Sequence, residues 1–341
     1  MAGASTSAEG QHDDLMAASI SGRVSHRAIA SGLVWGQPGG RDAPRRRAPH
    51  GPTDPSGRSC VGESVRVLVA FLCLGVATAR AEAPTHAALS ARAAALEKKL
   101  DGKGFSVLVE APFVLVGDEG PDKLRQRART VRWTRRLLMN DYFAVELDRA
   151  LEVWLFKDEK TYRRGAKDFF GDEPDTPYGY YSAAAGALVM NIGPGAGTLV
   201  HELVHPYLER NFPEVPAWFD EGLASLYERP TEVGGHIRGL PNWRLPALKR
   251  EIRTGKGRSL TSLMSTSRDE FYEAADNTYA RARYLCYYLQ EKGLLVAFYR
   301  RFKEHQADDP TGIAALRAVL DTDDLDGFEK IWSRFVLALD E

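Results

Sequence analysis

The sequence predicts an α+β protein in which strands come first and helices follow. Apolar, β-branched runs of strand length occur early, for example Phe105–Asp118 and Leu151–Phe156. Amphipathic helical patterns dominate beyond Arg229. The composition is that of a globular protein, because 44% of the 341 residues are hydrophobic and 27% are charged. This length suffices for one large or two modest domains.

The first 63 residues differ in composition from the rest of the chain. They contain no lysine, tyrosine or phenylalanine, and Gly36–Arg58 is rich in proline, glycine and arginine. Such a segment cannot bury enough apolar surface to offset the entropy lost on ordering. We therefore expect 1–63 to be disordered.

Residues 64–81 contain, in order, the three regions of a secretory signal peptide: a basic residue, an apolar run and small residues. Arg66 precedes a mostly apolar run at 67–79, and Ala-Arg-Ala at 79–81 has the form of a cleavage site. The run is too short to span a bilayer, and the alternative interpretation is a buried strand. We expect export to a secreted or periplasmic location, with no stable membrane span after cleavage.

A signal peptide at this position implies that translation starts near Val61 or Val65. If cleavage follows Ala81, Cys286 is the only one of the three cysteines that remains. No disulfide can then form within the chain, so the fold depends on its hydrophobic core.

The net charge of −1 creates no field that attracts nucleic acid, and we expect no nucleic-acid partner.

Periodicity and breaker residues define the elements of the mature chain. Gly102 and Gly104 end a first helix, and Pro121 begins another. Before the motif described below, we expect helices at His86–Leu100, Pro121–Asp141 and Glu159–Phe169, strands within Phe105–Asp118 and at Leu151–Phe156, and a hairpin over Tyr178–Gly193. Beyond it, we expect helices at Arg244–Arg253, Tyr279–Lys292, Leu294–His305, Gly312–Leu320 and Leu325–Leu339.

These elements suggest two lobes. We assign 82–228 to an α+β lobe and 229–341 to a mostly helical lobe. A functional site is expected in a cleft between two such lobes.

One short segment, "TLVHELVHPYLERNFPEVPAWFDEGLASLYE" at Thr198–Glu228, carries the chemistry. His201 and His205 are four apart on a predicted helix, so both imidazoles lie on one face. Two imidazoles with a common centre form half of a zinc site. Glu202 completes an H-E-x-x-H motif, in which the glutamate is the general base for a water activated by zinc.

A catalytic zinc usually takes three protein ligands, so a third residue is needed. Glu209 shares the face of the histidines but lies one turn beyond them. Pro216 opens a second helix that carries Asp220 and Glu221, and either acid can turn back towards the histidines.

The combination of "HELVH" with "WFDEGLA", with fifteen residues between His205 and Glu221, resembles the gluzincin metallopeptidases, specifically the bacterial peptidase-MA-like group. The resemblance covers Gly197–Glu228 and, more weakly, Tyr279–Phe302. It implies a gluzincin-type zincin fold, in which strands and the H-E-x-x-H helix precede a mostly helical lobe.

The resemblance also assigns roles to individual residues. It implies that His201, His205 and Glu221 bind one zinc ion and that Glu202 is the general base. Asp220 would then hold an imidazole N–H. Members of this group have a tyrosine on a later helix that stabilises the oxyanion, and Tyr279 stands in that place.

Three residues compete for the oxyanion role. Ala282 replaces the glycine that aminopeptidases have in the tyrosine motif, and Tyr279 could instead be a core residue of an aromatic helix. His236 and Arg283 are the alternatives to Tyr279.

The function expected from these features is an exported zinc metallopeptidase that acts on peptides or proteins. The chain lacks the G-x-M-E-N motif of exopeptidases, which favours an endopeptidase. The strand at Ala187–Ile192 could accept substrate backbone by strand addition. The alternatives are a catalytically degenerate zinc-binding scaffold at the cell envelope and a maturation protease with a single substrate. Glu202 favours hydrolysis, because it has no role as a ligand.

Overall fold

The computed structural model describes residues 83–340, apart from 175, 183–184 and 275–276. All of these residues belong to one compact unit of the chain. The predicted disordered segment at 1–63 and the predicted signal peptide at 64–81 lie outside the described residues. Within the described residues, no helix combines the length and the apolar character needed to cross a membrane.

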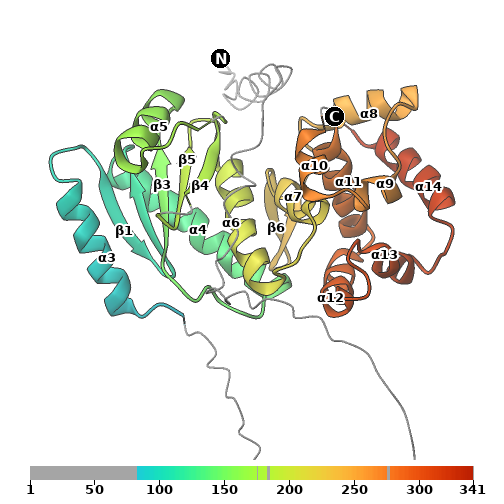
Figure 1. The fold of residues 1–341 in the computed structure, drawn as a ribbon, viewed down its shortest axis with the longest axis horizontal. Helices are drawn as coiled ribbons and strands as arrows, with labels where there is room; N and C mark the ends of the chain where they lie inside the picture. The colour runs from blue at the N-terminus through green and yellow to red at the C-terminus, as the bar shows by residue number, and fades with distance from the viewer. Residues whose placement is uncertain (1–82, 175, 183–184, 275–276, 341) are drawn as a thin grey trace, which may run out of the picture. The chain divides into compact units, whose positions relative to one another are not determined.

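A five-stranded mixed sheet forms the first half of the fold (Figure 1). Its strands are β1 (Ser106–Glu110), β2 (Phe113–Gly117), β3 (Leu151–Phe156), β4 (Gly179–Ser182) and β5 (Ala187–Asn191), in the spatial order β1-β2-β3-β5-β4. Strands β2, β3 and β5 are parallel, whereas β1 and β4 are antiparallel edge strands. The α+β class expected from the sequence is confirmed.

Both faces of the sheet are covered by helices, which explains the continuous apolar runs of its central strands. On one face, α3 (His86–Lys99) and α5 (Glu159–Gly165) pack against alternate side chains that include Val116 and Trp154. On the other face, α4 (Pro121–Asp141) and α6 (Ala196–Asn211) belong to a larger core that also includes the intervening side chains of the strands. A short π-helix, η1 (Ala166–Phe170), continues α5.

The chain beyond α6 is mostly helical, as expected, and it shares the larger core. Its helices are α7 (Ala217–Leu226), α8 (Leu245–Thr254), α9 (Leu260–Met264), α10 (Arg268–Glu273), α11 (Thr278–Glu291), α12 (Leu295–His305), α13 (Ile313–Leu320) and α14 (Leu325–Ala338).

The sequence interpretation missed a β-hairpin of β6 (Pro230–Val233) and β7 (His236–Gly239). Its turn consists of Gly234 and Gly235, which have φ angles of 59° and 84°. A two-residue turn with positive φ at both positions requires glycine or asparagine, so the Gly-Gly pair was the available signal.

The helix α7, which carries the second part of the Thr198–Glu228 segment, packs closely against α11. All residues of α7 are buried, and the helix packs along α11. A Cβ atom at Gly222 of α7 would lie 3.0 Å from the carbonyl oxygen of Ala282 on α11. Glycine therefore favours the close approach of α7, the helix that carries the neighbouring Glu221, to α11.

Candidate metal centre

Three buried side chains converge between α6 and α7. His201 and His205 come from α6 and Glu221 comes from α7, and one possible ligand atom of each lies within 4.8 Å of the others. The three residues are only 8%, 5% and 1% exposed. This buried group could hold a metal ion, and the sequence-based expectation that these residues meet is confirmed.

Helix geometry produces this convergence. The four-residue spacing on α6 brings the two imidazole rings to a centroid distance of 5.0 Å at an interplanar angle of 71°. Pro206 lies inside α6 without ending it. Pro216 caps α7, which then packs back on α6. As a result, the Oε2 atom of Glu221 lies 3.4 Å from the Nε2 atom of His201.

The donor atoms fit a divalent metal. The Nε2 atom of His205 and the Oε2 atom of Glu221 are buried, and neither has a hydrogen-bond partner among the described residues. A buried polar atom without a partner costs free energy, and coordination to a metal would satisfy both atoms. Two imidazole nitrogens and one carboxylate oxygen suit a metal of borderline softness.

The other ring nitrogen of His205 is held by Asp220, as the sequence suggested. The Oδ1 atom of Asp220 lies 2.7 Å from Nδ1 of His205. An Nδ1–H that donates to a carboxylate leaves Nε2 as the lone-pair nitrogen, which is the tautomer that a metal ligand needs.

His201 has a more distant carboxylate, which the sequence interpretation missed. The Oε1 atom of Glu228 lies 3.7 Å from Nδ1 of His201. Arg244 holds this carboxylate with two hydrogen bonds, from Nη2 to Oε1 at 2.7 Å and from Nε to Oε2 at 3.0 Å. Asn242 donates a third, at 2.8 Å. Glu228 lies just after the end of α7, so no helical spacing in the sequence indicated that it would approach His201.

The tyrosine hydroxyl that contacts Glu221 belongs to a residue not singled out from the sequence. Tyr272 on α10 donates a hydrogen bond to the Oε1 atom of Glu221 at 2.9 Å. The predicted Tyr279 lies beside it, with a ring-centroid distance of 6.4 Å between the two tyrosines. The guanidinium of Arg244 lies 5.4 Å from the centre of the Tyr279 ring.

The two alternatives to Tyr279 have other partners. His236 is an exposed residue of β7 whose Nδ1 atom lies 2.7 Å from Asp141 on α4. Arg283 is fully buried and donates to the backbone carbonyls of Ser225 and Leu240. Both side chains therefore connect structural elements to one another.

The electrostatics of the group favour a cation. Although burial opposes it, the Asp220 carboxylate raises the pKa of His205 to about 10. The imidazoles lower the pKa of Glu221 to about 2, again against the effect of burial. Burial raises the pKa of Glu202, which is only 3% exposed. A buried site that stabilises positive charge on an imidazole has a negative potential, which a metal ion would neutralise.

The strand expected to receive substrate, β5, is a central strand of the sheet and not an edge strand. Strand β5 (Ala187–Asn191) is paired with β3 on one side and with β4 on the other. Its backbone groups are therefore already used, and the prediction that it adds a substrate strand is wrong. In the sheet formed by the described residues, β4 (Gly179–Ser182) is the edge strand on that side.

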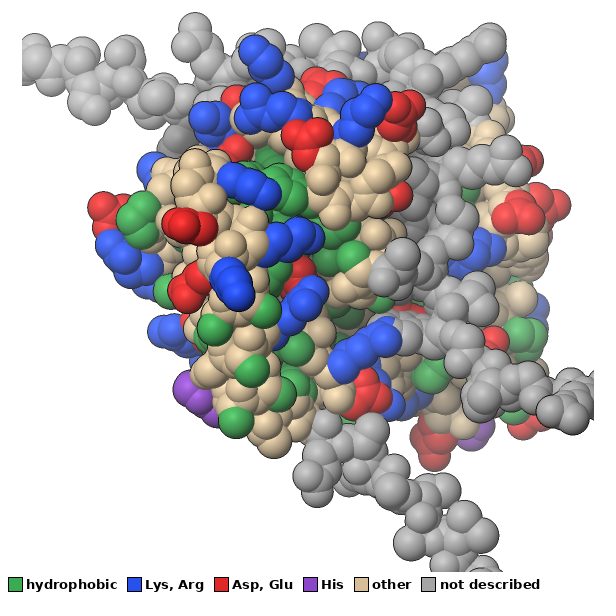
Figure 2. All heavy atoms as spheres, turned by 60° about the vertical axis from the view of Figure 1, so that its left-hand side comes forward, with side chains coloured by type: hydrophobic (Ala, Val, Ile, Leu, Met, Phe, Trp, Pro, Cys, Tyr) green, Lys and Arg blue, Asp and Glu red, His purple; other side chains and the backbone are tan. Residues whose placement is uncertain are grey.

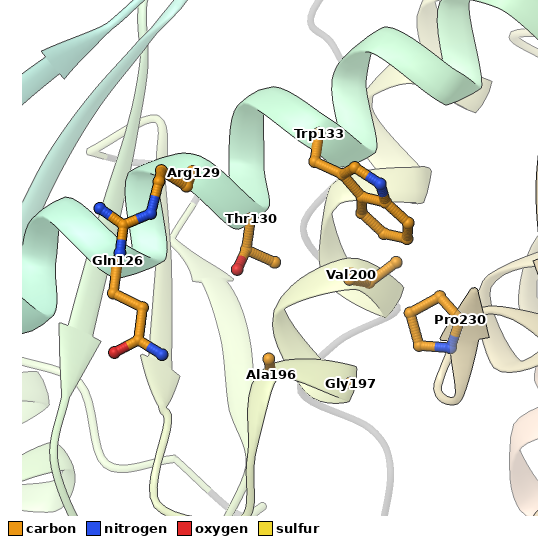
Figure 3. A pocket seen from close by; sticks show the side chains of 8 residues that line it. All are labelled: Gln126, Arg129, Thr130, Trp133, Ala196, Gly197, Val200 and Pro230. Atoms are coloured by element: carbon orange, nitrogen blue, oxygen red, sulfur yellow. The ribbon is translucent and has the colours of Figure 1, made fainter. Parts of the chain in front are cut away.

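A separate cavity of about 510 Å³ lies between α4 and the beginning of α6 (Figure 3). Thr130 and Trp133 of α4 are directed towards Ala196 and Val200 of α6. The remaining lining residues are Gln126, Arg129, Gly197 and Pro230.

Charges on the molecular surface are mixed. On the face shown in Figure 2, lysine and arginine side chains alternate with acidic ones. This face thus presents no large surface of a single sign. Elsewhere in the described part of the chain, arginines of α4 form ion pairs, for example Arg127 with Glu119 and Arg136 with Glu232.

A comparison with known protein families and with curated proteins finds no match for the chain.

Proposed function

We propose that the chain is a zinc-dependent metallopeptidase of the gluzincin type, with His201, His205 and Glu221 as the ligands of one zinc ion. One observation carries the proposal. Three buried donor atoms converge, those of His205 and Glu221 have no hydrogen-bond partner among the described residues, and Glu202 follows the first ligand directly.

The donor set is the reason for choosing zinc. Two histidines and one carboxylate form a common ligand set of catalytic zinc, which keeps a fourth position open. A structural zinc site usually has four protein ligands, often cysteines. The one cysteine among the described residues, Cys286, is buried in the core, so a structural site of that kind has no support here.

Glu202 is the proposed general base. When bound, zinc lowers the pKa of a water molecule and polarises the carbonyl of the scissile bond. Glu202 takes a proton from the attacking water and delivers it to the leaving amine. Burial raises the pKa of Glu202 above that of an exposed glutamate, towards the pH at which the enzyme would work. Both proton transfers benefit from such a pKa.

The proposed substrate is a peptide or protein outside the cytoplasm. The signal-peptide pattern at 64–81 supports export, and the absence of a G-x-M-E-N motif favours internal cleavage. A backbone strand of the substrate would meet the sheet at the edge strand β4, since β5 is already paired on both sides.

The test combines metal content with activity. We expect the purified protein to contain one zinc per chain by mass spectrometry and to cleave casein or a peptide library. His201→Ala should lose the metal, whereas Glu202→Ala should keep it and lose cleavage. A wild-type protein without a transition metal would refute the proposal. Bound zinc without cleavage of any tested substrate would favour a zinc-binding protein without turnover or a protease with a single substrate.

A further inference from the structure

The two carboxylate oxygens of Glu221 have different surroundings. Oε1 accepts a hydrogen bond from the hydroxyl of Tyr272 at 2.9 Å. Oε2 has no hydrogen-bond partner among the described residues and lies 3.4 Å from Nε2 of His201. The Glu221 carboxylate is thus oriented: Oε1 is hydrogen-bonded to Tyr272, and Oε2 faces His201.

We propose that Tyr272 is a positioning residue of the metal centre, which makes Glu221 a ligand through one oxygen only. This inference rests on the metal centre proposed above, but it does not depend on peptide hydrolysis.

The surroundings of Tyr272 support this role. Ser267 and Glu270 form a capping box that fixes the start of α10. The Tyr272 ring packs against Phe271 at a centroid distance of 5.5 Å. Its hydroxyl also accepts a hydrogen bond from Nη1 of Arg268 at 3.4 Å. A hydroxyl that accepts from a cation is a better donor, so Arg268 strengthens the hydrogen bond to Glu221.

The consequence for the site is an open coordination position. A carboxylate whose second oxygen is engaged by a tyrosine binds a metal through the first, and three ligand atoms then leave a fourth position open. If the tyrosine hydroxyl is removed, Oε1 is free to turn to the metal and occupy part of that position. Tyr272 therefore acts through Glu221 on both the affinity for the metal and the coordination number.

The principal experiment replaces Tyr272 with phenylalanine, which keeps the ring and removes only the hydroxyl. We expect the dissociation constant for zinc, measured by competition with a chromophoric chelator, to rise about 10-fold, at the lower end of the 10–100-fold cost of losing such outer contacts. The cobalt-substituted variant should absorb visible light more weakly than the wild type, because the intensity falls as the coordination number rises above four.

Tyr299→Phe is the matched control. It makes the same chemical change at a buried tyrosine of α12 whose hydroxyl has no partner among the described residues. Neither its zinc affinity nor its cobalt spectrum should differ from those of the wild type. Arg268→Gln, a change at an exposed residue, should weaken zinc binding in the same direction as Tyr272→Phe but by a smaller factor.

A double-mutant cycle distinguishes positioning from a general structural effect. In a Glu221→Ala background, Tyr272→Phe should leave the weakened zinc affinity unchanged, because the residue through which it acts is gone. An equal loss of affinity in both backgrounds would overturn the inference. So would unchanged affinity and an unchanged cobalt spectrum in Tyr272→Phe itself, although the proposed function would survive. Absence of metal binding in the wild type would instead refute the proposed function together with this inference.

Discussion

At the level of single residues, two of the three proposed ligands, His205 and Glu221, make a hydrogen bond to a side chain outside the group of three, and the third, His201, has a carboxylate nearby. Asp220 lies 2.7 Å from His205, Tyr272 lies 2.9 Å from Glu221, and Glu228 lies 3.7 Å from His201. Hydrogen bonds such as those of Asp220 and Tyr272 fix the tautomer of an imidazole and the orientation of a carboxylate before a metal binds. The candidate site is therefore organised beyond its three ligands.

The Asp220–His205 contact predicts a loss of metal affinity. Asp220→Asn removes the charge that favours the Nδ1–H tautomer of His205, and we expect zinc affinity to fall 10–100-fold in a chelator competition assay. Asp141→Asn is the matched control, because Asp141 is equally close to an imidazole, that of His236, at 2.7 Å. If both variants bind zinc as tightly as the wild type does, Asp220 does not orient His205.

A second residue-level prediction concerns Glu209, one turn beyond His205. Burial, and then the nearby Asp220 carboxylate, raise the pKa of Glu209 to about 7 from 4.5. The folded protein therefore retains a proton that the unfolded chain releases between these pH values. It follows that the stability contribution of Glu209 is lost as the pH rises through this window.

Glu209→Gln removes this pH-dependent penalty. We expect the variant to be about 1–2 kcal/mol more stable than the wild type at pH 8, a value reduced for partial exposure, and nearly unchanged at pH 5. Urea denaturation of both proteins at the two pH values measures the difference. Equal stability at pH 8 would show that the ionised Glu209 carboxylate is well solvated or paired.

At the level of elements, close contacts between backbones determine where the helices of the site lie. An ideal Cβ atom at Gly197, in the first turn of α6, would lie 2.0 Å from the carbonyl oxygen of Glu228. Glycine at this position lets the chain just after α7 approach the beginning of α6. The same residue, Glu228, directs its side chain towards His201.

Gly197→Ala should disturb both packing and the site. The added methyl group forces α6 and the chain at Glu228 apart, and overpacking of this kind costs about 1–3 kcal/mol. We expect a lower free energy of unfolding and weaker zinc binding, because Glu228 moves relative to His201. In the control, Gly327→Ala on α14, the added Cβ atom would meet the Asp324 side chain that caps α14, so stability should fall but the zinc affinity should not change. Unchanged zinc affinity in Gly197→Ala would mean that this contact does not position the site.

At the level of the whole molecule, the proposed ligands come from two helices, so metal binding would be coupled to folding. The buried cluster of acids and imidazoles forms only when α6 and α7 are packed together. An unfolded chain lacks this arrangement, so a metal that binds the folded state stabilises it.

This coupling predicts a change in thermal stability. Free zinc at 100 times its dissociation constant adds about 2.7 kcal/mol to the free energy of unfolding. For a domain of this size, that corresponds to a rise in Tm of about 5–10 °C over the chelator-treated protein. His201→Ala should show little rise under the same conditions. An identical Tm of the wild type with zinc and with chelator would indicate that the folded protein does not bind the metal.

Local patterns determined most of the elements and the part of the candidate site that lies on α6. The predicted helix at Pro121–Asp141 and the predicted strand at Leu151–Phe156 match the structure in their bounds, because periodicity and breaker residues act over a few positions. His201, Glu202 and His205 share one helix, so their spacing alone brings them together.

Contacts between distant residues were decided only by the tertiary structure. Tyr272 lies 51 residues from Glu221, and Arg244 lies 16 residues from Glu228. Their meeting depends on how α7, α8 and α10 pack, which no local pattern specifies. The hairpin expected over Tyr178–Gly193 pairs β4 with β5, but the pairing of β5 with β3 on its other side was hidden, because strand order is a property of the sheet and not of one strand.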